Sequence, residues 1–167
     1  DHLGCAVGAL LIPDKNIAVC RTGKDIAPRT GAEVLTKSHR PLLAWTQLHR
    51  RTMTANVPGA DSQFGAVPYK ILSCPVMHGA QSVLGILVLF KPPASPDFDL
   101  RQVRLIELLA RRVAYILMNA YDPTTGLLTR SAFEKRAHSL LAAATPQSSH
   151  CVIYVDIDRL HVLNENL

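Results

Sequence analysis

The stretch Val83-Leu84-Gly85-Ile86-Leu87-Val88-Leu89-Phe90 decides the fold, because it is apolar on both of its alternating faces. A strand with two apolar faces is covered on both sides, so this one is predicted to lie in the centre of a sheet. Gly85 has no side chain in the middle of the strand, which predicts a close approach by another element. The run from Tyr69 to Met77 is a second strand, and His78-Gly79-Ala80-Gln81 between the two indicates a hairpin.

Another hairpin is predicted near the start of the chain. Gly4 to Ile12 and Ile17 to Arg21 are apolar runs, and the turn-forming cluster Pro13-Asp14-Lys15-Asn16 separates them. Residues 56–67 are rich in Pro, Gly and Asp, so we interpret them as a loop. We expect any ligand pocket to lie between the sheet and residues 56–68.

Pro41 interrupts a helical pattern that runs from Glu33 to Thr52. Proline cannot donate a hydrogen bond inside a helix, so we predict a short helix to about Lys37 and a second helix starting at Pro41. The predicted inner face of the second helix consists of Leu42, Trp45 and Leu48.

The longest helix is predicted from about Asp97 to Tyr121, with Asp97 or Asp99 as its N-cap. It carries two apolar stripes. The first contains Leu105, Leu108, Leu109, Arg112 and Ile116. The second repeats with the 3-4 spacing of a heptad seam and consists of Val103, Ile106, Ala110, Val113, Leu117 and Ala120.

One stripe of this helix can cover the sheet, which leaves the other exposed on a monomer. Exposure costs about 25 cal/mol for each Å² of apolar surface. Heptad spacing is typical of helix pairing, so we predict a parallel homodimer through the second stripe. The alternative is that another part of the same chain covers that stripe.

Composition narrows the classes of partner. The net charge is +5, but Lys and Arg are scattered and aromatic residues make up 5% of the chain, so no nucleic-acid partner is expected. The apolar runs are too short to cross a bilayer, so the sequence predicts no membrane segment.

The cysteines Cys5, Cys20, Cys74 and Cys151 are widely spaced, which favours reduced thiols in a cytoplasmic protein over a disulfide framework or a zinc site. Cys74 and His78 would share one face of a regular strand, but two ligands do not make a metal site.

Further along, Ser131-x-x-Glu134 is the pattern of a capping box, so a helix is predicted there. Its apolar face consists of Phe133, Ala137, Leu140, Leu141 and Ala144. Residues 145–149 are a linker, and Cys151 to Val155 are predicted to form a buried strand that ends at two carboxylates, Asp156 and Asp158.

The order strand, strand, helices, strand, strand, long exit helix resembles the GAF fold, and PAS domains are the alternative. The resemblance covers about residues 1–121 and implies an α+β (α/β) class with an antiparallel sheet and flanking helices. It also implies a sensor, although nothing in the sequence selects the ligand. The usual leading helix of the family is missing before Leu3, so we expect the chain to be part of a longer protein.

Residues 122–167 resemble the opening of a GGDEF domain, the module that makes cyclic di-GMP from two GTP molecules. The stretch Asp122-Pro123-Thr124-Thr125-Gly126-Leu127-Leu128-Thr129-Arg130 matches the family's first motif at Asp122, Thr125, Gly126, Leu127 and Arg130, but Thr124 and Thr129 depart from it. The second motif matches at Asp156, Asp158 and Asn164. Leu160, His161 and Glu165 depart from it.

By this resemblance, Asp156 and the backbone carbonyl of Ile157 would bind Mg²⁺, and Asn164 would hold the guanine of GTP. The chain ends before the family's signature loop, so we expect this fragment to be inactive alone, and no residue in it is assigned as catalytic. The expected function is a GAF sensor that controls a diguanylate cyclase in a bacterial cytoplasmic protein. The alternatives are a degenerate GGDEF domain beside an EAL phosphodiesterase and a plain interaction module.

Overall fold

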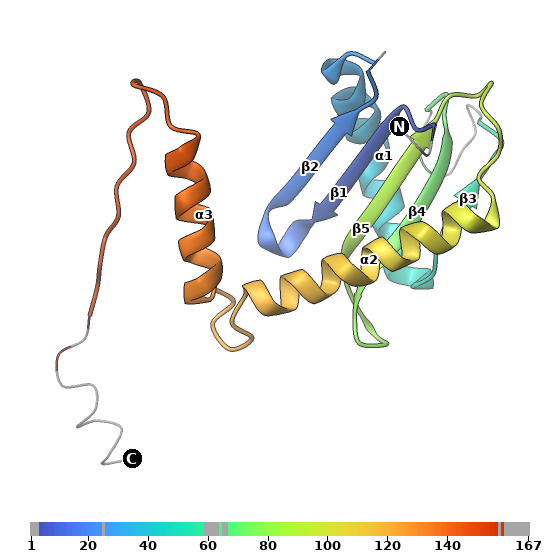
Figure 1. The fold of residues 1–167 in the computed structure, drawn as a ribbon. Coiled ribbons are helices and arrows are strands. Elements are labelled where there is room, and N and C mark those ends of the chain that lie inside the picture. The colour runs from blue at the N-terminus through green and yellow to red at the C-terminus, as the bar shows by residue number, and fades with distance from the viewer. Residues whose placement is uncertain (1–3, 25, 59–63, 65–66, 157, 159–167) are drawn as a thin grey trace. The chain divides into compact units, whose positions relative to one another are not determined.

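The computed structural model describes residues 4–24, 26–58, 64, 67–156 and 158. The chain divides into two compact units, one ending at Leu127 and the other beginning at Leu128. The sheet and the two longer helices belong to the first unit (Figure 1). No helix in the described part of the chain is long and apolar enough to cross a bilayer.

In the described residues of the first unit, five antiparallel strands form one sheet in the order β2-β1-β5-β4-β3. The strands are β1 (Val7–Ile12), β2 (Ile17–Thr22), β3 (Met53–Ala55), β4 (Lys70–His78) and β5 (Ser82–Lys91). Both predicted hairpins are confirmed, and β5 lies in the middle of the sheet as its two apolar faces require. The short edge strand β3 was missed, because three residues carry little periodicity.

Gly85 marks the predicted close approach. A methyl group there would overlap the backbone carbonyl of Leu11 and lie 2.7 Å from Cδ1 of Ile12. The sheet also bulges beside it, because the register of β4 and β5 shifts between Val76 and Met77.

Helix α1 (Pro28–His49) is continuous, so the predicted break at Pro41 is wrong. Pro41 forfeits the hydrogen bond to the carbonyl of Lys37, but a continuous helix places a full stripe of small and apolar side chains against the sheet. The buried residues of this stripe are Gly31, Val34, Ser38, Leu42 and Thr46. Leu42 is therefore an inner residue as predicted and Trp45 is partly buried, whereas Leu48 is 77% exposed and was wrongly assigned to the inner face.

Helix α2 (Leu100–Ala120) begins with a capping box. The carboxylate of Asp99 accepts a hydrogen bond from the Gln102 amide at 2.8 Å, and Oε1 of Gln102 accepts one from the Asp99 amide at 3.3 Å. This confirms Asp99 as the N-cap.

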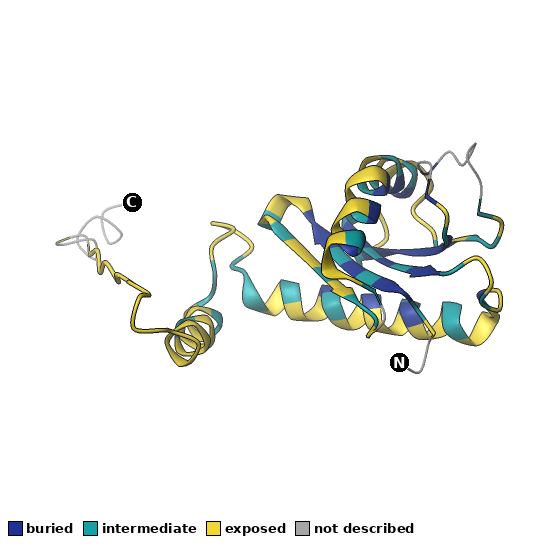
Figure 2. Cartoon of the chain, turned by 90° about the horizontal axis from the view of Figure 1, so that it is seen from above, coloured by how far each residue is buried: buried dark blue, intermediate teal, exposed yellow. Residues whose placement is uncertain are grey.

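The two helices cover opposite faces of the sheet (Figure 2), since alternate side chains of each strand point to opposite sides. On the α1 side the core includes Val34, Leu42, Ile71, Val88 and Phe90. On the α2 side it includes Leu72, Val76, Phe98, Ile106 and Ala110.

The second stripe of α2 packs against the sheet of the same chain. Its assignment as a dimer seam is therefore wrong, and the alternative, that another part of the same chain covers it, is correct. Its members Val103, Ile106, Ala110, Val113 and Leu117 all belong to the α2-side core, and Ala120 is partly buried. The small side chains of Ala110 and Ala114 let the helix approach the sheet closely, which the bulkier first stripe cannot do. The first stripe is exposed, as the yellow face of α2 shows in Figure 2.

Two buried lysines attach the first turn of α2 and the segment before it to the sheet. Lys70 and Lys91 are opposite each other in β4 and β5. Nζ of Lys70 donates to Oδ1 of Asp97 at 2.6 Å, and Nζ of Lys91 donates to Oε1 of Gln102 at 2.9 Å. Asp97 is therefore an ion-pair partner and not a helix cap.

In the second unit, α3 (Arg130–Ala142) begins before the predicted capping box. Thr129 is the N-cap, and its hydroxyl accepts a hydrogen bond from the Ala132 amide at 3.4 Å. Ser131 consequently lies inside the helix, and Glu134 pairs instead with Nε of Arg130 at 2.8 Å.

Residues 151–156 form no strand, and Val152 to Val155 are each at least 75% exposed, so the predicted buried strand is wrong. A strand needs a neighbour to share its hydrogen bonds, and the described residues of this unit offer none.

Candidate functional site

The acidic motif that begins at Asp122 forms a compact turn directly after α2. Oδ1 of Asp122 accepts hydrogen bonds from the Thr125 amide at 2.7 Å, the Thr125 hydroxyl at 2.8 Å and the Thr124 amide at 3.1 Å. The Asp122 amide donates to the Leu127 carbonyl at 2.8 Å. Gly126 closes the turn with a φ of +69°, in the left-handed region where glycine is unstrained. The turn therefore uses Asp122, Thr125 and Gly126 structurally, which explains why these residue types occur at this spacing.

The hydrogen bonds of this turn also act on the charge of Asp122. The amide and the hydroxyl of Thr125 stabilise the carboxylate, and they hold the pKa of Asp122 below its ordinary value. The turn is consequently built around an ionised aspartate at neutral pH.

Lys15 joins this turn to the β1–β2 hairpin. Nζ of Lys15 donates to the Gly126 carbonyl at 3.1 Å and lies 4.3 Å from the centre of the Tyr121 ring, which is the C-cap of α2. The first of these contacts connects residues 111 positions apart in the sequence. These contacts attach the C-terminal end of α2 to the connection between β1 and β2.

A cavity of about 420 Å³ lies beside this contact. Ile12, Leu84, Leu117, Met118 and Pro123 give it an apolar lining, and Asp14, Lys15, His78 and Asp122 supply polar groups. Its mixed lining is of the kind that holds small organic molecules.

The acidic motif that contains Asp156 and Asp158 lies only partly within the residues that the structure describes. Asp156 and Asp158 are exposed, whereas Ile157 and Asn164 lie outside the described residues. The described residues contain no cluster of three or more His, Cys, Asp or Glu side chains that could hold a metal. The predicted roles of Asp156, Ile157 and Asn164 therefore stay predictions.

Core side chains pack between the sheet and the described residues of the 56–68 segment, where a ligand pocket was expected. Phe64 and Val67, from the predicted loop, are buried there at 5% and 2% exposure. The Phe64 ring meets the Trp45 ring edge-on at 6.1 Å, and the Tyr69 ring meets the Phe90 ring at 6.3 Å. Trp45 is thus a packing residue in this structure.

The cysteines of the first unit favour the protonated thiol form. Burial raises the pKa of the thiols of Cys5, Cys20 and Cys74 above its ordinary value, so each stays protonated at neutral pH. Cys74 and His78 are not brought together as ligands of one site. They line different cavities.

No protein-family model and no curated protein matches the sequence. Solved structures do match. The GAF domain/HD domain protein from Geobacter sulfurreducens superposes with a TM-score of 0.53 at 16% identity, over 69% of this chain and 82% of that one. The GAF domain from Acinetobacter phosphoenolpyruvate-protein phosphotransferase gives 0.52 at 18% identity, over 72% and 75%.

The fold is GAF-like. At these identities the likeness concerns architecture alone. In this GAF-like domain, the sequence drew attention to the motif that begins at Asp122 but not to Lys15, which was interpreted only as part of a hairpin turn. No local signal could have revealed its partners, because both belong to a distant segment that the tertiary fold brings to the hairpin.

Proposed function

We propose that the GAF-like domain is the sensory part of a bacterial cyclic di-GMP signalling protein, and that it controls a GGDEF module beginning at Asp122. One observation carries the proposal. The turn that matches the GGDEF opening motif continues α2 without a linker, and Lys15 holds it to the sensor sheet. A shift of the sheet or of α2 is thereby transmitted directly to the first residues of the output module.

The chemistry of the output module requires oxygen ligands for Mg²⁺ and two GTP molecules face to face. Mg²⁺ is usually held by one or two carboxylates together with water and phosphate oxygens. Asp156 and Asp158 offer carboxylates of this kind, and the Ile157 carbonyl and Asn164 would add a metal ligand and a guanine contact. Bound Mg²⁺ would neutralise phosphate charge during condensation.

Pairing of two output modules calls for a dimer, and we assign it to the exposed stripe of α2. Four large side chains of this stripe, Leu105, Leu108, Leu109 and Ile116, are between 41% and 61% exposed. A second copy aligned in parallel would cover them. Arg112 lies in the same stripe, so paired copies bring like charges together, and salt that screens them should strengthen the dimer.

The dimer is tested by sedimentation of the Leu108→Glu variant, which should shift the chain to monomer. Leu48→Glu is the matched control, because Leu48 is exposed on α1, outside the stripe. Val113→Glu is unsuitable, since Val113 packs into the core and its loss would unfold the domain. A wild-type chain that stays monomeric at every concentration and salt level contradicts the assignment.

The activity is tested on the natural protein that contains this chain, with GTP and Mg²⁺ and detection of cyclic di-GMP. Asp156→Ala should abolish product, because it removes the proposed metal ligand, while Glu33→Ala, at an exposed carboxylate on α1, should not. The 167-residue chain alone should make none. Full activity of the Asp156→Ala protein would refute the proposed site.

Two observations favour non-catalytic alternatives. The departures from the GGDEF motifs at Thr124, Thr129 and His161 suit a degenerate domain that regulates an EAL phosphodiesterase. In that case the natural protein would bind GTP without converting it. The filled face beneath α1 suits a GAF-like domain that responds to a protein partner and not to a small ligand.

A further inference from the structure

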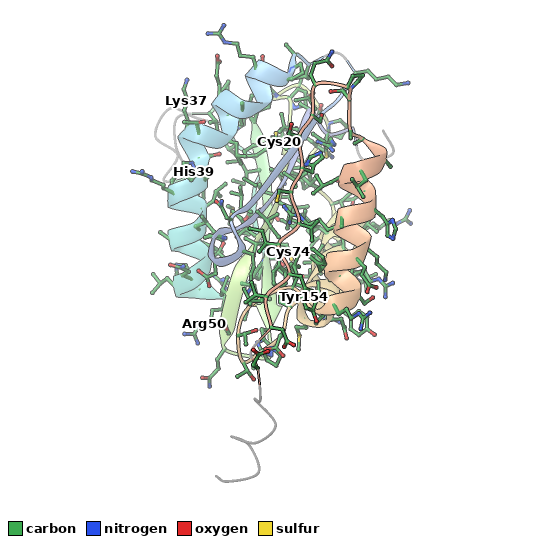
Figure 3. All side chains as sticks on the ribbon, turned by 90° about the vertical axis from the view of Figure 1, so that its left-hand side faces the viewer. Cys20, Lys37, His39, Arg50, Cys74 and Tyr154 are labelled. Atoms are coloured by element: carbon green, nitrogen blue, oxygen red, sulfur yellow. The ribbon has the colours of Figure 1, made fainter. Side chains whose placement is uncertain are left out.

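A second cavity, of about 390 Å³, lies on the α2 side of the sheet and gathers arginines from separate parts of the chain. Arg50 and Arg51 come from the end of α1 and the residue after its cap, and Arg111 comes from the middle of α2. Thr52, Cys74 and Glu107 line the same space, together with Pro75, Met77 and Gly79. Figure 3 shows Arg50 at the lower end of α1, and Cys74 within the sheet.

The charges of this cavity are unbalanced. Three arginines line it together with one carboxylate, that of Glu107, whose Oε1 already accepts the Thr52 hydroxyl at 2.8 Å. The carboxyl end of α1 adds a partial negative charge equivalent to about half an elementary charge. The cavity is therefore still positive, and guanidinium forks are the groups that bind phosphate and carboxylate oxygens best.

The backbone of Arg50 gives a second reason. Arg50 is the C-cap of α1 with a φ of +52°, and its amide donates to the Thr46 carbonyl. Glycine is the usual residue at such a left-handed position, because a side chain there is strained. The chain thus keeps a guanidinium at a place where its backbone would favour glycine, and strained residues cluster at ligand sites.

We infer that this cavity binds a small oxyanion, a phosphate or carboxylate group, between Arg50, Arg51 and Arg111. The inference goes beyond the proposed function and does not depend on it. Its occupant would bridge the end of α1 and the middle of α2, and Glu107 would accept a hydrogen-bond donor on the same molecule. The guanidinium of Arg51 also lies 5.9 Å from the ring centre of Trp45.

The test is titration of the 167-residue chain with inorganic phosphate and, separately, with malonate at constant ionic strength. Binding is followed by calorimetry and by amide NMR shifts at Thr52, Gly79 and Glu107. We expect saturable binding of at least one of the two anions. Phosphate alone would assign the site to phosphate esters, malonate alone to carboxylates, and binding of both to oxyanions in general.

Three variants make the test specific. Arg111→Gln should weaken the affinity about tenfold, the effect of one lost charged hydrogen bond. Arg112→Gln is the matched control, because its neighbouring guanidinium lies over the Tyr115 ring at 5.5 Å and does not line the cavity. Arg50→Gly should also weaken binding, yet it should keep or raise the unfolding midpoint because it relieves the left-handed strain.

Loss of affinity without loss of stability in Arg50→Gly separates a ligand contact from a structural one. The inference is overturned if neither anion saturates. It is equally overturned if Arg111→Gln and Arg112→Gln change the affinity to the same extent, or if Arg50→Gly binds like the wild type.

Discussion

Replacement of Lys15 by methionine is the most direct probe of the link between the sensor sheet and the Asp122 turn. The substitution keeps most of the aliphatic stem and removes the ammonium group. Two contacts are lost, the hydrogen bond to the Gly126 carbonyl at 3.1 Å and the cation–π contact with Tyr121 at 4.3 Å. A net hydrogen bond contributes about 0.5–1.5 kcal/mol, and an exposed cation–π contact contributes about 0.5–1 kcal/mol.

Together the two contacts stabilise the closed turn by about 1–2 kcal/mol. Local opening of the turn should therefore become about 5–30 times more frequent in Lys15→Met. Hydrogen exchange reports this directly at the amides of Asp122 and Gly126, which donate to the Leu127 and Asp122 carbonyls. Exchange of core amides such as that of Val88, which is fully buried in β5, should not change.

Lys37→Met is the matched control, because Lys37 is an exposed lysine on α1 (Figure 3). It should leave exchange at Asp122 and Gly126 at the wild-type rate. If Lys15→Met also leaves those rates unchanged, the contact does not hold the turn, and the proposed path from the sheet to the output module loses its support.

Two further predictions concern the sheet. Gly85→Ala should destabilise the domain by about 1–3 kcal/mol in urea unfolding, towards the upper end, because the Leu11 carbonyl it would strike is backbone. Gly8→Ala is the control and should stay within about 1 kcal/mol of wild type, since it meets only the flexible end of Leu89 at 3.3 Å. Burial raises the pKa of the Cys74 thiol above 9.0, so the folded state holds this proton more tightly. Stability should therefore be unaffected by this group below pH 9.0 and fall above it, and Cys74→Ala should reduce that alkaline loss in thermal unfolding.

The sheet was predictable because its signals are local. The alternation of apolar residues and the turn-forming clusters set both hairpins, and Asp99 with Gln102 set the start of α2. The turn at Asp122 was predictable for the same reason, since its hydrogen bonds join residues no more than five positions apart.

The errors came where packing overruled a local rule. A proline inside a helix normally interrupts it. In α1 the helix continues past Pro41, because Leu42 and Thr46, one turn apart, are both buried against the sheet. The seam spacing of α2 described a real apolar stripe. Its small residue Ala110 and the neighbouring Ala114 suit close packing against a sheet better than packing against a second helix. The apolar residues from Val152 to Val155 do not form a strand without a neighbour to pair with.

The sequence by itself determined the two hairpins, the start of α2 and the form of the Asp122 turn, because each depends on interactions between near neighbours in the chain. Only the tertiary structure decided which face of α2 meets the sheet, which partners Lys15 finds, and that Arg50, Arg51 and Arg111 share one cavity. Those outcomes join segments far apart in the chain, and side-chain volume and charge select them only once the sheet has formed.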